Sequence, residues 1–169
     1  MLGSVIPSSR FLVHDVMSQI DWEQARVVVE FGPGVGTITQ EIVKRLHPEA
    51  ILVAIELNPN FARFLEDEID DPRVHVVHGS ALNVRQVLQR MNLPSADCII
   101  SGIPFTNMRS SLRRSIAREA REALRPAGAF VVYQFTRTAL PYLISNFASV
   151  RQDFQLWNIF PARIFYCTP

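Results

Sequence analysis

The sequence has one lysine, two cysteines, four histidines and no long apolar run. Lys44 is the single lysine, so all the other strongly basic side chains are arginine. Cys98 and Cys167 form neither a disulfide framework nor a zinc-binding pattern, and the histidines form no ligand cluster, so we expect no metal. No apolar stretch approaches the roughly 18 residues of a membrane span. The first residues lack the charged start and apolar run of a signal peptide, so we expect a cytoplasmic protein.

The chain has 169 residues, of which 48% are hydrophobic, and its formal net charge is +1. This length suits one domain over residues 1–169, and the hydrophobic content is sufficient for a core. The small net charge creates no strong field that would draw the whole protein to nucleic acid or to a membrane. We expect a monomer.

Helix and strand patterns alternate along most of the chain. We expect helices over 8–20, 37–46, 59–69, 83–91 and 109–124, and strands over 26–31, 50–56, 73–78, 96–101 and 128–135. A short helix near 139–147 then precedes two strands, about 150–157 and 160–167, with no helix between them. The predicted fold is α/β, a doubly wound and mostly parallel seven-stranded sheet with a C-terminal antiparallel hairpin. Such sheets bind ligands at the carboxyl ends of their strands.

A glycine-rich turn follows the first predicted strand. That strand ends with Glu30, and Gly32, Gly34 and Gly36 then alternate with other residues. Glycines here let the backbone bend sharply and let a ligand approach the main chain. A nicotinamide-binding fingerprint would need its third glycine at the position of Thr37. The pattern Glu-x-Gly-x-Gly-x-Gly is instead typical of class I methyltransferases that use S-adenosylmethionine, and a plain turn is the alternative.

Acidic residues at the strand ends are further candidates for contact with this cofactor. Glu56 ends the second strand and lies about 20 residues after the glycine-rich turn. In such folds an acidic residue at about this distance binds ribose hydroxyls. Its two oxygens can accept from both hydroxyls, and Leu57 is expected beside it. Glu30 is expected to brace the loop by accepting backbone donors, or to contact the methionine end of the cofactor. An ordinary exposed strand end is the alternative for Glu56.

Serine-containing segments complete the expected cofactor site. Many class I methyltransferases have an Asp at the position of Ser80 that contacts the adenine amine, so here the backbone of Ala81 is expected to contribute beside Ser80. Ser8 and Ser9 are expected to close over the cofactor or donate to its carboxylate, or else to cap the first helix. Ser101, which ends the fourth strand, is expected to face both cofactor and substrate.

The segment Ser101-Gly102-Ile103-Pro104-Phe105 lies where amino-methylating enzymes place a short loop over the reacting nitrogen. We expect these five residues to form the catalytic site. In adenine N6-methyltransferases the loop reads Asn/Asp-Pro-Pro-Tyr or Asn-Leu-Pro-Tyr, and the Asn or Asp accepts a hydrogen bond from the flipped adenine. Gly102 stands at that position without a side chain, which argues against adenine chemistry, although Phe105 can still stack. A strand-ending turn is the alternative.

These segments together resemble the bacterial phospholipid N-methyltransferases, which convert phosphatidylethanolamine stepwise to phosphatidylcholine. The similar segments span nearly the whole chain: Gly3–Leu12, Glu30–Gly34, Ile55–Phe61, Ser101–Met108 and Asn158–Arg163. The resemblance implies S-adenosylmethionine as the cofactor, the amine of the phospholipid headgroup as the acceptor, and peripheral attachment to the inner face of the membrane. Members of that family carry an amphipathic segment before the Pro-Ser-Ser stretch, and here the chain begins almost at that stretch.

Two other functions stay open. The related ribosomal RNA adenine dimethylases share the sheet and the aliphatic-Pro-aromatic loop. They also carry a C-terminal helical RNA-binding domain, for which this chain ends too early, so nucleic acid is the less expected partner. A cofactor-binding module without catalysis is the third function.

The acceptor amine has to be uncharged when it attacks the methyl group. The candidate bases are Tyr133, Glu30 and the backbone carbonyls of residues 101–103. We expect the mouth of the site to include Phe11, Leu12 and the segments 105–108 and 137–142, so that apolar side chains can enter the headgroup layer.

Residues 109–125 carry six arginines. In a helix, Arg114, Arg118, Arg121 and Arg125 fall on the side opposite the apolar residues. They are expected to attract anionic headgroups or nucleic-acid phosphates, or else to form an ordinary solvated face.

Overall fold

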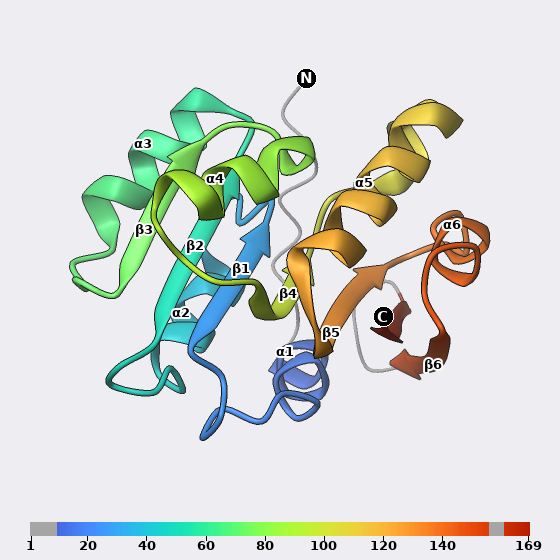
Figure 1. Ribbon diagram of the computed structural model, residues 1–169, viewed down its shortest axis with the longest axis horizontal. Helices are drawn as coiled ribbons and strands as arrows, with labels where there is room; N and C mark the ends of the chain where they lie inside the picture. Colours follow the sequence, from blue (N-terminus) through green and yellow to red (C-terminus); the bar gives the residue numbers. More distant parts are fainter. Residues whose placement is uncertain (1–9, 156–160) are drawn as a thin grey trace.

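A computed structural model describes residues 10–155 and 161–169. Its strands are β1 Val27–Phe31, β2 Ile51–Glu56, β3 Val74–His78, β4 Ala96–Ser101, β5 Leu124–Gln134, β6 Ser149–Gln155 and β7 Ala162–Thr168. They form one sheet in the order β3-β2-β1-β4-β5-β7-β6 (Figure 1). All neighbours are parallel except that β7 is antiparallel to both β5 and β6. The predicted seven-stranded sheet with a C-terminal antiparallel hairpin is confirmed.

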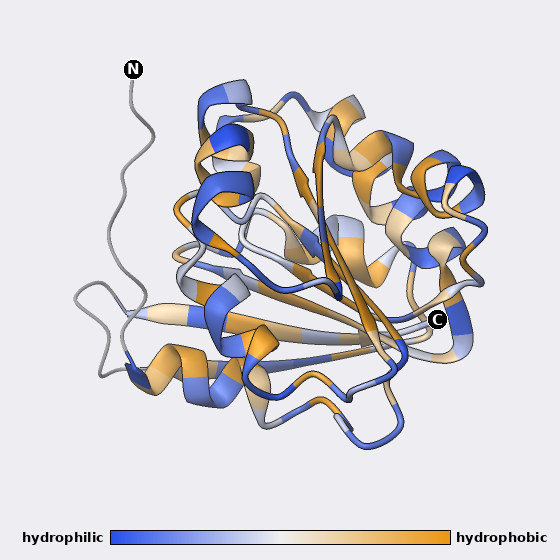
Figure 2. Ribbon diagram, turned by 90° about the vertical axis from the view of Figure 1, so that its left-hand side faces the viewer, coloured by the Kyte–Doolittle hydropathy of each residue, from blue (hydrophilic) through white to orange (hydrophobic). Residues whose placement is uncertain are grey.

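Helices cover both faces of this sheet, as expected for a doubly wound fold (Figures 1 and 2). They are α1 Arg10–Met17, α2 Thr37–Val43, α3 Pro59–Glu68, α4 Val84–Arg90, α5 Ser110–Ala123 and α6 Leu140–Ile144, with 3₁₀ turns η1 Ala81–Asn83 and η2 Phe105–Asn107. One core cluster joins the sheet to α4, α5 and α6, and the other joins it to α1 and α2.

Strand β1 shows how the sequence feeds both cores. Val27, Val29 and Phe31 belong to the cluster beneath α4 and α5, whereas Val28 belongs to the cluster beneath α1 and α2. Successive side chains of a strand point to opposite faces, so a strand covered on both faces has to be apolar throughout. All five β1 residues are buried, which places Glu30 in the interior at the end of the strand.

Strand β5 begins earlier than the sequence predicts. Helix α5 ends at Ala123, and Leu124 already pairs with Ala96 of β4 in an extended conformation. The register shifts before Cys98 pairs with Ala129, so Pro126 and Gly128 lie in an irregular part of the strand. A Cβ on Gly128 would lie 3.0 Å from the Arg125 carbonyl oxygen and 3.1 Å from that of Ala96. Pro126 and Gly128 therefore mark an irregularity in β5, where Pro and Gly are tolerated within a strand.

Candidate functional site

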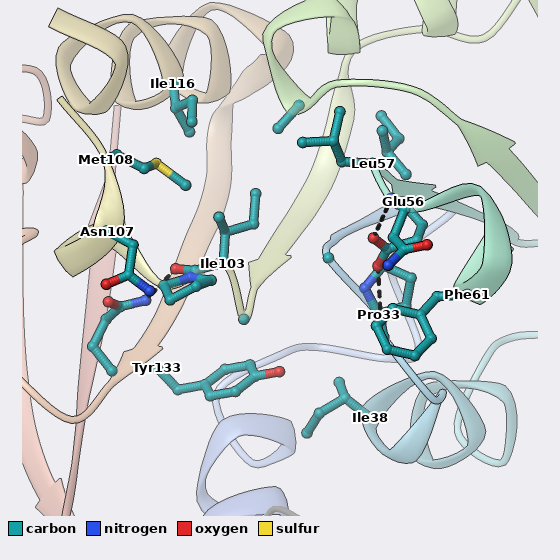
Figure 3. A pocket seen from close by; sticks show the side chains of 18 of the residues that line it. Pro33, Ile38, Glu56, Leu57, Phe61, Ile103, Asn107, Met108, Ile116 and Tyr133 are labelled. Atoms are coloured by element: carbon teal, nitrogen blue, oxygen red, sulfur yellow. Dashed lines mark hydrogen bonds between the residues drawn. The ribbon is translucent and has the colours of Figure 1, made fainter. Parts of the chain in front are cut away.

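A pocket of about 1010 Å³ opens at the carboxyl ends of the parallel strands. Pro33, Glu56 and Phe61 gather on one side of it, Asn107 and Met108 lie on the other, and Ile103 lies between (Figure 3). We call the side with Pro33, Glu56 and Phe61 the glycine-loop side, and the side with Asn107 and Met108 the β4-loop side. The predicted position of the site, at the carboxyl edge of the sheet, thus holds a cavity of the size that small-molecule ligands occupy.

The three glycines after β1 have positive φ angles but different surroundings. Gly32 and Gly34, with φ of 67° and 59°, line the pocket. No atom lies within 4 Å of the place where a Cβ of Gly34 would stand, so the backbone is open to a ligand there. Gly36, with φ of 82°, does not line the pocket, and its Cβ would lie 2.7 Å from Leu65 of α3. Gly36 therefore allows close packing against α3, and its contact with a cofactor stays a prediction.

The carboxylate of Glu56 holds the glycine-loop side together. Its Oε2 accepts from the backbone N–H of Gly34 at 3.0 Å, and its Oε1 accepts from that of Asn58 at 2.8 Å. Glu56 is 7% exposed and lines the pocket. A carboxylate has about four acceptor sites, so two backbone donors leave capacity for ligand hydroxyls.

The turn after Glu56 is shaped by helix capping. Asn58 Oδ1 accepts from the backbone N–H of Asn60 at 2.9 Å, and Pro59 opens helix α3. Leu57, 70% exposed, lines the pocket, and so do Ser80 and Ala81 after β3. The Ser80 hydroxyl also accepts from the backbone N–H of Leu82 at 3.3 Å and caps η1.

Glu30 lies behind the glycine loop instead of bracing it. It is 1% exposed and does not line the pocket, and within the described residues neither carboxyl oxygen has a hydrogen-bond partner. The hydroxyls of Thr39 and Ser101 are also buried without partners there. The pKa of Glu30 is raised to about 8, mainly because the carboxyl is buried. The Thr39 hydroxyl has a smaller effect that lowers this pKa, and the charge of Glu56 raises it slightly further. Glu30 therefore stays largely protonated at neutral pH, and the expected acceptance of backbone donors is not seen.

The β4 loop contributes only part of the expected catalytic segment. Gly102, Ile103 and Pro104 line the pocket. Ser101 and Phe105 do not line it, and both are fully buried. Phe105 belongs to the core cluster beneath α5, so in this structure its ring is not available to stack on a substrate base. Phe105 is the first residue of the 3₁₀ turn η2, and its ring is buried. The sequence alone does not reveal this inward orientation.

Two side chains that the sequence analysis did not select hold the β4 loop. Gln134 Nε2 donates to the carbonyl of Ile103 at 2.5 Å, and its Oε1 accepts from the N–H of Phe105 at 3.2 Å. Arg113 donates to the carbonyls of Phe105, at 2.8 Å, and Thr106, at 3.1 Å. A signal for Gln134 existed, since it is a polar residue that ends an apolar central strand on the ligand-binding edge.

Tyr133 fills the space beside Gly102. A Cβ on Gly102 would lie 2.7 Å from Tyr133 Cζ, and the phenol oxygen is closer still. Burial raises the pKa of the Tyr133 phenol, and the neighbouring Glu30 raises it further. Tyr133 therefore remains a neutral phenol, and its prediction as a proton-accepting base is not supported.

The other expected residues of the mouth are only partly brought together. Leu12 of α1 and residues 106–108 line the pocket, whereas Phe11 and the segment 137–142 do not. Ser8, Ser9 and Asn158 lie outside the described residues. Within the described part of the chain, no helix is long and apolar enough to cross a membrane. The same residues contain no group of three or more His, Cys, Asp or Glu side chains that could hold a metal ion.

Comparisons with known proteins agree with this geometry. The family model for ribosomal RNA adenine dimethylase matches residues 2–118. An ornithine lipid N-methyltransferase of Singulisphaera acidiphila is 33% identical, over 98% of this chain and 88% of that protein. A ribosomal RNA small subunit methyltransferase A of Clostridium perfringens is 37% identical, but over only 41% of this chain and 24% of its own length.

The solved structures show the same fold. A SAM dependent methyltransferase of Aquifex aeolicus superimposes with a TM-score of 0.71, over 94% of this chain and 90% of that chain. The two sequences are 12% identical, so this similarity concerns the fold alone.

Proposed function

Because this chain belongs to the lipid N-methyltransferases that are related to the ribosomal RNA adenine dimethylases, we propose that it methylates the amine of a phosphatidylethanolamine-type phospholipid headgroup. The chain is an S-adenosylmethionine-dependent methyltransferase. The observation that carries the proposed acceptor is Gly102. The position from which adenine methyltransferases offer an amide or carboxylate to the base has no side chain here, and the ring of Tyr133 occupies the adjacent space.

The residues of the glycine-loop side fit the cofactor. Gly34 presents an open backbone to the pocket, and Glu56 has acceptor capacity left for the two ribose hydroxyls. Ala81 and Ile103 supply apolar surface for the adenine ring. These four residues would hold S-adenosylmethionine, with Leu57, Ser80 and Gly32 beside them. When bound, the cofactor supplies a methyl group on a positively charged sulfur, which is a good leaving group.

The chain's own task is to position the amine and to exclude water. Pro104 and Met108 are apolar residues on the β4-loop side, and Ile103 adds apolar surface between the two sides. Gln134 and Arg113 hold this loop through backbone contacts, so its shape is set before substrate binds. No described carboxylate other than Glu56 lines the pocket, and Glu56 is engaged by two backbone donors. These contacts leave no described side-chain carboxylate of the pocket free to act as the base, and we propose water as the group that takes the extra proton of the amine.

The relative from Singulisphaera acidiphila supports a second candidate acceptor, an ornithine lipid. Both lipids present a primary amine close to a negatively charged group, so the same pocket chemistry suits either. The family model supports a third acceptor, the adenine of ribosomal RNA.

The three acceptors can be compared directly. The protein is incubated with methyl-labelled S-adenosylmethionine and, in separate reactions, phosphatidylethanolamine vesicles, ornithine lipid vesicles and unmethylated ribosomal RNA. We expect label in phosphatidylethanolamine and none in RNA. Label in ornithine lipid alone would replace the proposed headgroup, and label in RNA alone would refute a lipid acceptor.

A further inference from the structure

Gly102, directly after β4, and Tyr133, near the end of β5, form a matched pair in the pocket. We propose that the Tyr133 hydroxyl accepts a hydrogen bond from the N–H of the methyl-accepting amine, and so supplies from β5 the acceptor that Gly102 lacks. This inference rests on the proposed function in that the acceptor is an amine that carries hydrogen when neutral.

The first step of the argument is the space beside Gly102. A Cβ there would lie 2.7 Å from Cζ and 3.3 Å from Cε2 of Tyr133, with Oη nearer than both. The φ angle of Gly102 is not positive, so the glycine is required by space and not by backbone conformation. The phenol oxygen thus stands where the side chain of an Asn or Asp at position 102 would begin.

The second step is the direction of the hydroxyl. Tyr133 lines the pocket, and Figure 3 shows its hydroxyl pointing toward the open centre, on the same side as Ile38. No hydrogen bond joins this hydroxyl to another described residue. Tyr133 packs against the core cluster that contains Leu12 and Ile38, and the carboxyl of Glu30 is close enough to raise the pKa of its phenol. A ligand N–H that reaches this oxygen therefore meets an acceptor that no described side chain or backbone group already occupies.

The third step is the chemical role. Burial and the nearby Glu30 raise the pKa of the phenol, so Tyr133 keeps its proton and does not act as the base. A neutral phenol oxygen can still accept through its lone pairs. Accepting from one N–H fixes the direction of the nitrogen lone pair, which is the orientation that methyl transfer needs.

The role predicts a dependence on the number of methyl groups already present. A neutral primary amine has two N–H bonds and a monomethyl amine has one, whereas a neutral dimethyl amine has none. Tyr133→Phe should therefore slow the first transfer about tenfold, the effect of one lost hydrogen bond. It should leave whatever rate the wild type shows with dimethyl-phosphatidylethanolamine unchanged. A purely structural role of Tyr133 would slow both reactions alike.

The experiment measures kcat and KM for full-length wild type and Tyr133→Phe with phosphatidylethanolamine and with its dimethyl form. Tyr166→Phe is the matched control, because the Tyr166 hydroxyl donates to the Asp15 carbonyl at 3.1 Å and does not line the pocket. Binding of S-adenosylhomocysteine by calorimetry should be equal in all three proteins. A first-transfer rate of Tyr133→Phe within twofold of wild type, or equal slowing with both lipids, overturns the proposal.

A measurement on the wild-type protein decides the question if Tyr133→Phe does not fold. The chain has three tyrosines, and Tyr142→Phe and Tyr166→Phe assign two of the three Cζ carbon signals in NMR spectra of the labelled protein. In the complex with S-adenosylhomocysteine, short-chain phosphatidylethanolamine should shift the Tyr133 signal, and short-chain phosphatidylcholine, which has no N–H, should not. Absence of a shift with phosphatidylethanolamine overturns the proposal. If wild type methylates only ornithine lipid or RNA, the proposed function fails. The role of Tyr133 is then still decided with that acceptor, by the ratio of the wild-type and Tyr133→Phe rates and by the shift of the Tyr133 Cζ signal.

Discussion

The backbone N–H of Gly34 donates to Oε2 of Glu56 at 3.0 Å, and this contact joins the turns that follow β1 and β2. The other carboxylate oxygen accepts from the N–H of Asn58 at the entry to α3. One side chain thereby sets the position of the glycine loop and of the neighbouring helix start. Glu56 consequently acts on the cofactor in two ways, through its own free acceptor sites and through the loop that it holds.

Removing this carboxylate should weaken cofactor binding strongly. Glu56→Ala loses two charge-assisted hydrogen bonds within the site and the acceptors for ribose. We expect the Kd for S-adenosylhomocysteine to rise at least roughly tenfold, the factor that about 1.4 kcal/mol produces. Glu41→Gln is the control, since Glu41 pairs with Lys44 and Arg45 on the surface of α2. Calorimetry in which Glu56→Ala binds as tightly as wild type would refute the assignment.

Gly34 and Gly36 should respond differently to the same change. Gly34→Ala strains a left-handed backbone, at about 1–2 kcal/mol, and directs a methyl group into the open pocket. Gly36→Ala adds a clash with buried Leu65 to the same strain. We expect Gly34→Ala to lose affinity for S-adenosylhomocysteine, and Gly36→Ala to lower Tm further while the folded protein binds normally. The reverse pattern in calorimetry and thermal unfolding would contradict the assignment of the two glycines.

Buried Glu30 should make the protein less stable as the pH rises. Its pKa is about 8 in the folded state against 4.5 for an exposed glutamate, so between these values the folded protein holds a proton that the unfolded chain has released. Stability therefore falls from about pH 4.5 to about pH 8, by at most on the order of 5 kcal/mol. Glu30→Gln should flatten this slope in urea unfolding, whereas Glu66→Gln on the surface of α3 should not. An equal slope in wild type and Glu30→Gln would show that Glu30 is not the cause.

The arginines near the start of α5 should increase binding to anionic lipid. Arg109 and Arg114 are exposed, whereas Arg113 holds the β4 loop and Arg125 lies in β5 and pairs with Asp97 at 2.6 Å. The predicted four-arginine face is thus reduced, because Arg125 lies beyond the helix.

Charge reversal tests this surface. We expect the double variant Arg109→Glu/Arg114→Glu to co-sediment less with anionic vesicles at low salt, by about 1 kcal/mol or more per residue. The difference should vanish at high salt. Arg90→Glu/Arg121→Glu is the control. It changes the net charge by the same amount in the last turns of α4 and α5, away from the pocket edge, and it should bind like wild type. Equal loss in both double variants would indicate a general charge effect.

The fold and the edge that carries the site could be predicted because they follow from local patterns. Apolar runs such as Val27–Phe31 mark buried strands, and Asn58-Pro59 marks the start of α3. Parallel strands bring their carboxyl ends to one edge, so Gly34 and Glu56 were expected to lie together, as they do. The exact start of β5 depended on pairing between Leu124 and Ala96, which local patterns do not contain.

The inward or outward direction of each site residue could not be predicted. Phe105 and Ser101 neighbour pocket residues in sequence but face the core, and Gly36 faces Leu65. The role of Gln134 depends on hydrogen bonds to residues about thirty positions away, and that of Tyr133 depends on Gly102 in the loop after another strand. Such complementarity between strands exists only once the sheet is assembled.

The central claim, methylation of a lipid amine by S-adenosylmethionine, is tested most directly by locating the transferred methyl group. Wild type and Glu56→Ala are incubated with methyl-labelled S-adenosylmethionine and phosphatidylethanolamine vesicles, and the headgroups are released and analysed by mass spectrometry. We predict label on the ethanolamine nitrogen with wild type and strongly reduced label with Glu56→Ala. Unlabelled headgroups with wild type, in a preparation that binds S-adenosylhomocysteine and methylates ribosomal RNA, would contradict the account.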